Sequence, residues 1–226
     1  MAKPLFDGVY QVEVEGYGQQ LATLNLVPGV RSYGERLIKT DFGELRVWDP
    51  YRSKLAAAIK KGIRTLPITT GSRVLYLGAA AGTTVSHISD IVGRNGVVYA
   101  VEFSARSIRE LLVACESRQN VVPILADARR PLDYRRYADC VDVVYADVAQ
   151  PDQAEITVEN AKVYLRKEGW VILNIKARSV DVAVEPTKVY DQQRSVLLDA
   201  GFKIIEEVEL SPYEKDHDFI IAKLAR

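Results

Sequence analysis

The chain has 226 residues, 48% of them hydrophobic, and carries 30 Lys and Arg residues against 30 Asp and Glu residues. No apolar run reaches the roughly 18 residues that a membrane span needs, and the opening MAKPLFDG lacks the apolar core of a secretory signal, so we expect a cytoplasmic protein without membrane contact. A protein that binds nucleic acid unaided usually has a cationic excess, so with this balanced charge any RNA substrate would need partners to hold it.

The first 49 residues are predicted to form a small antiparallel β module. Residues 9–14 (VYQVEV) and 21–26 (LATLNL) alternate apolar and polar side chains, which is typical of half-buried strands. Residues 41–43 (DFG) are a turn signal between two further strand-like segments. Asp49 and Pro50 end this pattern, so we place a domain boundary near Asp49, with a second domain over residues 50–226.

The second domain is predicted to have an α/β, Rossmann-like fold. A helix over residues 52–63 opens it, and beyond Arg73 apolar runs alternate with amphipathic stretches. Continuous runs of Val, Ile, Leu and Tyr mark strands buried on both faces, as in a parallel sheet that helices cover. The predicted strands are residues 74–77, 97–101, 121–126, 141–146 and 170–175, and the predicted helices are residues 83–92, 105–117, 152–166 and 187–201.

The C-terminal end of the chain has a different pattern. Two strand-like segments, residues 203–211 and 217–224, are separated by only five residues. A crossover between parallel strands needs a dozen or more residues, so this connection demands an antiparallel hairpin. An otherwise parallel sheet with one reversed C-terminal strand is the methyltransferase variant of the Rossmann plan.

Each predicted buried strand is followed by a glycine or a charged residue, which contributes little to a hydrophobic core. Because parallel strands share one carboxyl edge, and open α/β sheets bind ligands there, these residues are candidates for chemistry. The predicted hairpin brings His217, at the start of the reversed strand, to the same edge. The other strand-end residues are Gly78, Glu102, Asp127, Asp147 and Lys176.

The segment LGAAAGTT, residues 77–84, joins a strand to a helix. Its small residues would let backbone N–H groups and the helix N-terminus approach a ligand closely. A glycine loop alone is weak evidence, and the plain alternative is a tight turn packed without a ligand. The candidate loop residues are Gly78, Ala79, Ala81 and Gly82.

Two acidic strand ends suggest an adenosine site. Glu102 could accept both hydroxyls of a ribose, and the neighbouring Phe103 could stack on adenine. Asp127 could accept from the adenine amine, with the N–H of Ala128 reaching a ring nitrogen. Each acid taken singly could equally be a helix cap, but three correctly placed signals favour a nucleoside cofactor.

Asp147 and Lys176 form the sharpest pair of candidates. Charged residues seldom end fully buried strands without a partner or a task. A salt bridge that locks two adjacent strands is the structural alternative to a functional pair.

The two cysteines, Cys115 and Cys140, lack CxxC spacing, so we expect two reduced buried thiols, with neither a disulfide framework nor a metal site.

The chain resembles the fibrillarin family, which consists of RNA ribose 2′-O-methyltransferases dependent on S-adenosylmethionine. The resemblance covers essentially the whole chain, and its motifs occur in the family's order and at similar spacing. The glycine-arginine-rich tail of the eukaryotic members is absent, so the chain looks like the archaeal form. The motifs are RSKLAAAI, YLGAAAGTTVSH, VYAVEFS, DARRP, ADVAQPDQA, IKA and SPYEKDH.

The resemblance implies a site and a set of partners. Two positions depart from the family pattern, Ala81 in the glycine loop and Ala105 after EFS. The implied partners are a Nop-domain scaffold protein, an L7Ae-type kink-turn-binding protein and a box C/D guide RNA that selects rRNA and tRNA targets. The implied catalytic set is Lys54, Asp147, Lys176 and His217, and the implied cofactor contacts are Thr83, Thr84, Glu102, Phe103, Asp127, Ala128, Asp147 and Gln150.

The sulfonium methyl of S-adenosylmethionine is already electrophilic, so the protein must mainly align a ribose 2′-OH with it. We expect Lys176 to contact that hydroxyl, with Lys54 nearby favouring a neutral lysine, Asp147 orienting it and His217 shaping the site. A nicotinamide-dependent oxidoreductase is a rival function, which the reversed hairpin and the DVAQPDQ loop disfavour. A non-catalytic scaffold in an RNA–protein particle and a protein glutamine methyltransferase are further alternatives.

Overall fold

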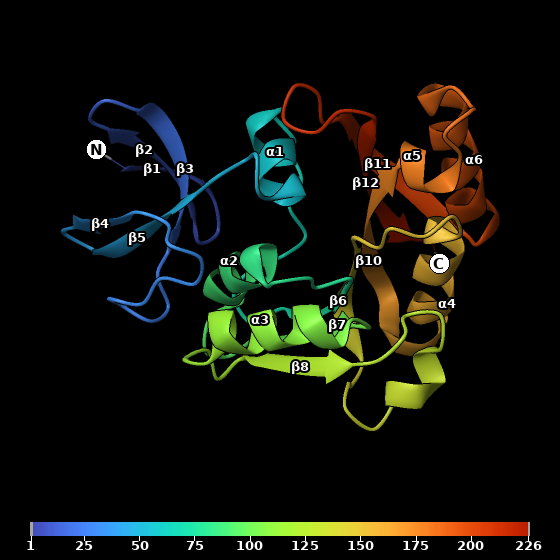
Figure 1. The fold of residues 1–226 in the computed structure, drawn as a ribbon, viewed down its shortest axis with the longest axis horizontal. Coiled ribbons are helices and arrows are strands. Elements are labelled where there is room, and N and C mark those ends of the chain that lie inside the picture. Colours follow the sequence, from blue (N-terminus) through green and yellow to red (C-terminus); the bar gives the residue numbers. More distant parts are fainter. Residues whose placement is uncertain (1, 226) are drawn as a thin grey trace.

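The computed structural model describes residues 2–225 and contains two β-sheets. A five-stranded sheet has the order β1-β2-β3-β5-β4, and a seven-stranded sheet has the order β11-β12-β10-β9-β6-β7-β8 (Figure 1). The chain leaves the first sheet after Trp48, close to the predicted boundary at Asp49. The division into domains at residue 49 stays a prediction, because one hydrophobic core runs across both parts.

All pairings in the five-stranded sheet are antiparallel. The predicted DFG turn is present: Thr40 faces Gly43, and the hydroxyl of Thr40 donates to the Gly43 carbonyl. The strands are β1 (Ala2–Phe6), β2 (Val9–Val14), β3 (Gly18–Leu24), β4 (Leu37–Thr40) and β5 (Gly43–Trp48).

The seven-stranded sheet has the predicted mixed topology. Its first four strands in the chain and β10 run parallel, whereas β12 pairs antiparallel with both β10 and β11. The predicted reversal of the C-terminal strand is therefore confirmed. The strands are β6 (Arg73–Leu77), β7 (Val97–Glu102), β8 (Val121–Leu125), β9 (Val141–Ala146), β10 (Leu165–Lys176), β11 (Phe202–Glu209) and β12 (His217–Leu224).

Helices cover both faces of this larger sheet. In β6, Val74 and Tyr76 contact the core that contains α1 and α2, whereas Leu75 and Leu77 contact the core beneath α4 and α6. This alternation follows from the two-residue period of a strand, and it explains why the strand is apolar throughout. The helices are α1 (Lys54–Lys60), α2 (Thr83–Val92), α3 (Ala105–Cys115), η1 (Pro131–Tyr134), α4 (Gln153–Tyr164), α5 (Ala177–Val180) and α6 (Pro186–Asp199).

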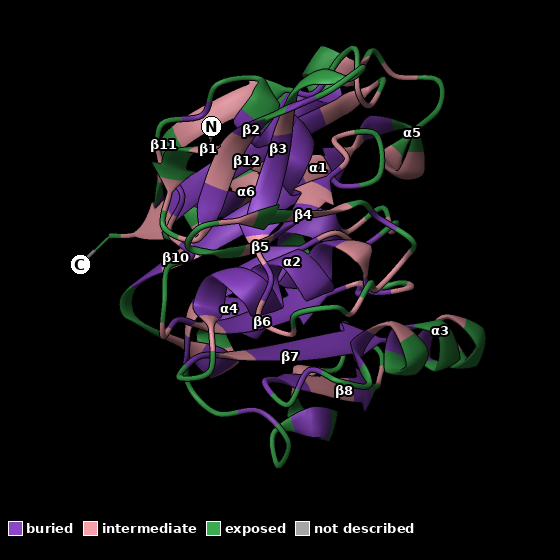
Figure 2. Cartoon of the chain, turned by 90° about the vertical axis from the view of Figure 1, so that its left-hand side faces the viewer, coloured by how far each residue is buried: buried purple, intermediate pink, exposed green. Residues whose placement is uncertain are grey.

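Helix α2 lies between the two sheets. It is buried over nearly its whole length, whereas α3 buries only Ile108, Leu111 and Cys115 and leaves its outer face exposed (Figure 2). A buried polar network fixes α2 to the small sheet: Arg46 of β5 binds Asp90 of α2 at 2.8 Å. The small sheet is thus joined to the rest of the molecule by buried contacts.

Two predicted details differ from the structure. Helix α1 is shorter than the predicted helix over residues 52–63, because Ser53 caps its start and Gly62, with φ +92°, leaves the helical region after its end. Cys115 is buried as predicted, but Cys140 is exposed in the loop before β9, so that prediction is wrong for Cys140. Within residues 2–225, no helix combines the length and the apolar character needed to cross a bilayer.

Candidate active site

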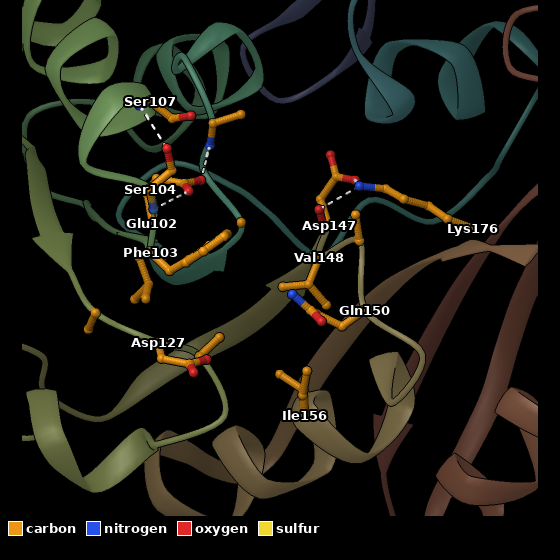
Figure 3. Close-up of a pocket in the computed structure, with 16 residues that line it drawn as sticks. Glu102, Phe103, Ser104, Ser107, Asp127, Asp147, Val148, Gln150, Ile156 and Lys176 are labelled. Carbon is orange, nitrogen blue, oxygen red and sulfur yellow. Dashed lines mark hydrogen bonds and ion pairs between the residues drawn. The ribbon is translucent and has the colours of Figure 1, made fainter. Parts of the chain in front are cut away.

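A cavity of about 420 Å³ lies at the carboxyl edge of the seven-stranded sheet. Its volume lies within the range typical of small-molecule sites. The loops after β6, β7, β8 and β9 and the end of β10 form its walls, so the structure brings all five predicted strand ends together. Residues that line it include Gly78, Glu102, Phe103, Asp127, Ala128, Asp147, Gln150 and Lys176 (Figure 3).

The glycine loop after β6 forms the floor of the cavity. Gly78 has φ +79°, and a Cβ atom there would lie 2.7 Å from the carbonyl oxygen of Asp147, so no other residue fits without backbone movement. The N–H groups of Gly78 and Ala79 donate to the carbonyl of Val101 and are therefore not free for a ligand. The free backbone donors are instead those of the first turn of α2, after Gly82.

Glu102 is 6% exposed at the end of β7. Its two carboxylate oxygens accept from the N–H groups of Ala80 and Ser104, each at 2.8 Å, which holds the carboxylate in one orientation. Each oxygen keeps a second lone pair for a ligand hydroxyl. Phe103 is 69% exposed beside it, so an aromatic face is available to a flat ring in the cavity.

Asp127 faces Phe103 from the loop after β8 (Figure 3). Its Oδ1 accepts from the N–H of Arg129 at 2.9 Å, which leaves Oδ2 available as an acceptor. The carbonyl of Ala128 accepts from the buried side chain of Asn160 at 2.8 Å. This contact fixes the backbone of the loop to α4.

Lys54, Asp147 and Lys176 form one cluster at the other end of the cavity. Asp147 Oδ1 lies 2.9 Å from Nζ of Lys176 and 3.3 Å from Nζ of Lys54. Nζ of Lys176 also donates to the Asp147 carbonyl at 2.8 Å. The salt bridge that was the structural alternative is therefore present between the ends of β9 and β10. A bridge that only joined two strands would need neither the second cation, Lys54, nor a position at the cavity.

The charge of Asp147 is stabilised by its two lysines. Burial raises the pKa of Asp147, but the charges of Lys54 and Lys176 and their hydrogen bonds outweigh burial, so that the pKa lies below its ordinary value. Nζ of Lys176 lies 2.9 Å from Oδ1 and 2.8 Å from the carbonyl oxygen of Asp147, so one residue holds the amine in place through two contacts. The neutral form of Lys176 expected from the sequence stays a prediction.

Lys54 reaches the cluster because α1 begins at this residue. The hydroxyl of Ser53 accepts from the N–H of Ala56 and caps the helix. The hydroxyl of Thr84 in turn donates to Ser53 at 2.9 Å, so the first turns of α1 and α2 are joined. Thr84 is 7% exposed and is not among the residues that line the cavity.

His217 lies opposite Lys176 in the pairing of β10 with β12. Its Nδ1 is 2.7 Å from the carbonyl oxygen of Lys215. A carbonyl oxygen can only accept, so Nδ1 is the donor in this contact.

The cavity does not include every predicted residue. Seven lie outside its lining: Lys54 and His217 at the catalytic end, and Ala79, Ala81, Gly82, Thr83 and Thr84 of the loop. Tyr76 was missed by sequence reasoning, although its hydroxyl lies 3.4 Å from Asp147 Oδ2 and a tyrosine within an aliphatic strand was a signal for it. The lining residues that were not predicted are Ala80, Val101, Ser104, Ser107, Ala126, Val148, Ala149 and Ile156.

Comparison with known proteins shows which family this chain is similar to. A family model described as Fibrillarin matches residues 1–226. A protein named fibrillarin-like rRNA/tRNA 2′-O-methyltransferase from Methanococcus maripaludis is 48% identical over 219 residues, which cover 97% of this chain and 95% of that relative.

Solved structures are similar over nearly the same length. Aeropyrum pernix fibrillarin in complex with natively bound S-adenosyl-L-methionine has a TM-score of 0.89 and 51% identity, covering 95% of this chain and 94% of that one. A fibrillarin chain from a fibrillarin/Nop5p complex has a TM-score of 0.86 and 40% identity, covering 97% of this chain and 99% of that one.

Proposed function

The chain belongs to the fibrillarin family, and from this we propose that it is an enzyme that methylates the ribose 2′-OH of rRNA and tRNA with S-adenosylmethionine. The observation that carries the proposal is the position of the Lys54–Asp147–Lys176 cluster at one end of a cavity. The other end is lined by residues that could bind a nucleoside, namely Glu102, Phe103 and Asp127. One group of residues can therefore bind a cofactor while the other aligns a hydroxyl.

The cavity residues fit S-adenosylmethionine. Glu102 would accept the ribose hydroxyls, Phe103 would stack on the adenine, and Asp127 with Ala128 would read its edge. Gly78 approaches the Asp147 carbonyl too closely for a side chain, so the loops after β6 and β9 pack directly against each other at the cavity. Gln150 and the backbone N–H groups of Thr83 and Thr84 would complete the predicted contacts.

When bound, the cofactor supplies an electrophilic methyl group. The protein's task is to hold the ribose 2′-OH in line with it, which Lys176 would do from Nζ while Asp147 keeps that lysine in place. Lys54 forms a second ion pair with Asp147, which holds the carboxylate between the amines of Lys54 and Lys176. His217 lies opposite Lys176 in the strand pairing and would shape or polarise the site.

We propose that the chain works within an RNA–protein assembly. A structural relative occurs in a fibrillarin/Nop5p complex, so a Nop-domain scaffold protein is the first partner. An L7Ae-type protein and a box C/D guide RNA would complete the particle and select the target nucleotide. The chain has 30 basic and 30 acidic residues and therefore no excess of positive charge for contacts with RNA phosphates. This balance supports a role for the partners in binding the RNA. We place this assembly in the cytoplasm.

The test is methyl transfer from tritiated S-adenosylmethionine in a reconstituted particle with a guide RNA and a matching target. We expect label on one ribose of the target, and no label when the target carries a 2′-O-methyl group at that nucleotide. Label in a partner protein's glutamine would favour a protein methyltransferase. Cofactor-independent assembly with no transfer would favour a scaffold role.

A further inference from the structure

Opposite walls of the cavity come from loops that no strand pairing connects. Asp127 follows β8 and Gln150 follows β9, but β6 and β7 lie between those two strands in the sheet. The relative position of the two loops at the mouth of the cavity therefore depends on side chains. Asn160 of α4 holds the carbonyl of Ala128, but it makes no contact with Gln150.

Arg129 spans this gap with its guanidinium group. Nε and Nη2 donate to the two carboxylate oxygens of Asp152, both at 3.0 Å, in the planar fork that suits arginine. Nη2 also donates to Oε1 of Gln150 at 2.7 Å. The N–H of the same residue donates to Asp127 Oδ1 at 2.9 Å. One residue thus organises an acceptor on each side of the cavity.

The contact with Arg129 decides which end of the Gln150 amide faces the ligand. Arginine has only donors, so it must bind the amide oxygen, and the amide nitrogen is left as the exposed end. Figure 3 shows this nitrogen turned into the cavity, on the side of Phe103 and Asp127. A free glutamine would offer its oxygen or its nitrogen there without preference.

We infer that Arg129 is a positioning residue for cofactor binding, whose guanidinium group holds Gln150 as a hydrogen-bond donor toward the cofactor. This inference rests on the proposed function, since it takes S-adenosylmethionine as the occupant of the cavity. The residue itself stays at the rim: its side chain is 44% exposed and that of Asp152 is 42% exposed. Ion pairs as exposed as this one contribute little to folding stability, so the effect belongs to binding.

The test is a double-mutant cycle on cofactor affinity, measured by isothermal titration of the full chain with S-adenosylmethionine. We expect Arg129→Ala to raise Kd roughly 3- to 10-fold, the loss of one oriented hydrogen bond. In the Gln150→Ala background the same change should have little further effect, because the group that Arg129 orients is absent. Arg129→Lys should fall between, since a lysine cannot form the fork.

Arg130→Ala is the matched control. Arg130 is the next residue, is 71% exposed and pairs with Asp133 away from the cavity, so Kd should stay at the wild-type value. The thermal midpoint of the ligand-free Arg129→Ala variant should match that of the control. A wild-type Kd in Arg129→Ala, or losses in the two single variants that simply add, would overturn the inference while leaving the proposed function intact. A wild-type chain that fails to bind the cofactor would instead remove the proposed function.

Discussion

The hydroxyl of Thr84 donates a hydrogen bond to Oγ of Ser53 across 2.9 Å, deep behind the cavity. This contact joins the first turn of α2 to the N-cap of α1, and Lys54 is the first residue of α1. A residue that the family resemblance suggested as a cofactor contact therefore lies where it can set the position of Lys54, a predicted catalytic residue.

We expect Thr84→Val to lower the free energy of unfolding by about 1 kcal/mol, because a buried hydrogen bond is lost at nearly constant volume. The variant should slow methyl transfer in the assembled particle and leave the Kd for S-adenosylmethionine nearly unchanged. Chemical denaturation, single-turnover kinetics and titration measure the three quantities. A large rise in Kd with unchanged stability would instead place the Thr84 hydroxyl in the cofactor site.

Lys176→Ala should slow methyl transfer by roughly 10² to 10⁴, the range for a positioned proton-transfer group. The Kd for the cofactor should change little, since Lys176 lies at the catalytic end of the cavity. Lys54→Ala is the comparison, and it should slow the same step less, because Lys54 lies farther from Asp147 Oδ1, at 3.3 Å rather than 2.9 Å. Single-turnover rates at saturating cofactor decide this, and wild-type turnover in Lys176→Ala would remove that lysine from the mechanism.

Asp127→Ala should weaken cofactor binding by about 1 to 3 kcal/mol, because the adenine would lose a hydrogen-bond acceptor. Replacement by Asn keeps an acceptor at Oδ1 for the N–H of Arg129 and should weaken binding less. Titration with S-adenosylmethionine gives both values. Equal affinity in the wild type and Asp127→Ala would exclude this residue from the site.

The isolated chain should bind S-adenosylmethionine yet methylate naked RNA poorly at physiological salt. Its formal net charge is zero, and affinity for RNA rests largely on phosphate contacts. Addition of the scaffold protein, the kink-turn-binding protein and the guide RNA should restore activity. Efficient methylation of one specific ribose by the chain alone would show that the assembly is dispensable.

His87 should make folding stability fall as the solution becomes acidic. Burial, together with the charges of Arg46 and Arg118, holds the pKa of His87 well below its ordinary value, so the folded protein keeps this ring neutral. The unfolded chain binds a proton near pH 6.5, which favours unfolding below that pH. The contribution of His87 is therefore complete above about pH 6.5 and decreases by up to about 1.4 kcal/mol for each pH unit below it.

Asp218 opposes this slope. Burial and Glu207 raise the pKa of Asp218 to about 7, so the folded state binds a proton that the unfolded state releases above about pH 4, and this stabilises the fold as the pH falls toward the ordinary pKa. The effect of His87 must therefore be read as a difference. Between pH 6.5 and pH 5, the free energy of unfolding of His87→Gln should rise relative to that of the wild type as the pH falls. Parallel curves would contradict a neutral buried His87.

The sequence predicted the site best where a residue ends a strand. Glu102, Asp127, Asp147 and Lys176 each interrupt an apolar run, and the carboxyl ends of parallel strands share one edge, so a local pattern was enough to bring them together. The limits of helix α2 were predicted for the same kind of reason, because its first turn follows the glycine loop directly. Its burial on almost all sides was not predicted, since that depends on the small sheet.

The amino-acid sequence by itself determined the order of the elements, the reversed last strand and the acidic strand ends, because burial, turn residues and loop lengths are local properties of the chain. Only the tertiary structure decided which side chains meet between elements. Lys54 resembles any solvated helix lysine in the sequence, and its ion pair with Asp147 depends on where α1 lies. The contacts of Thr84 with Ser53 and of Arg129 with Gln150 likewise join segments far apart in the chain. No local pattern encodes such contacts, since they depend on how whole elements are packed.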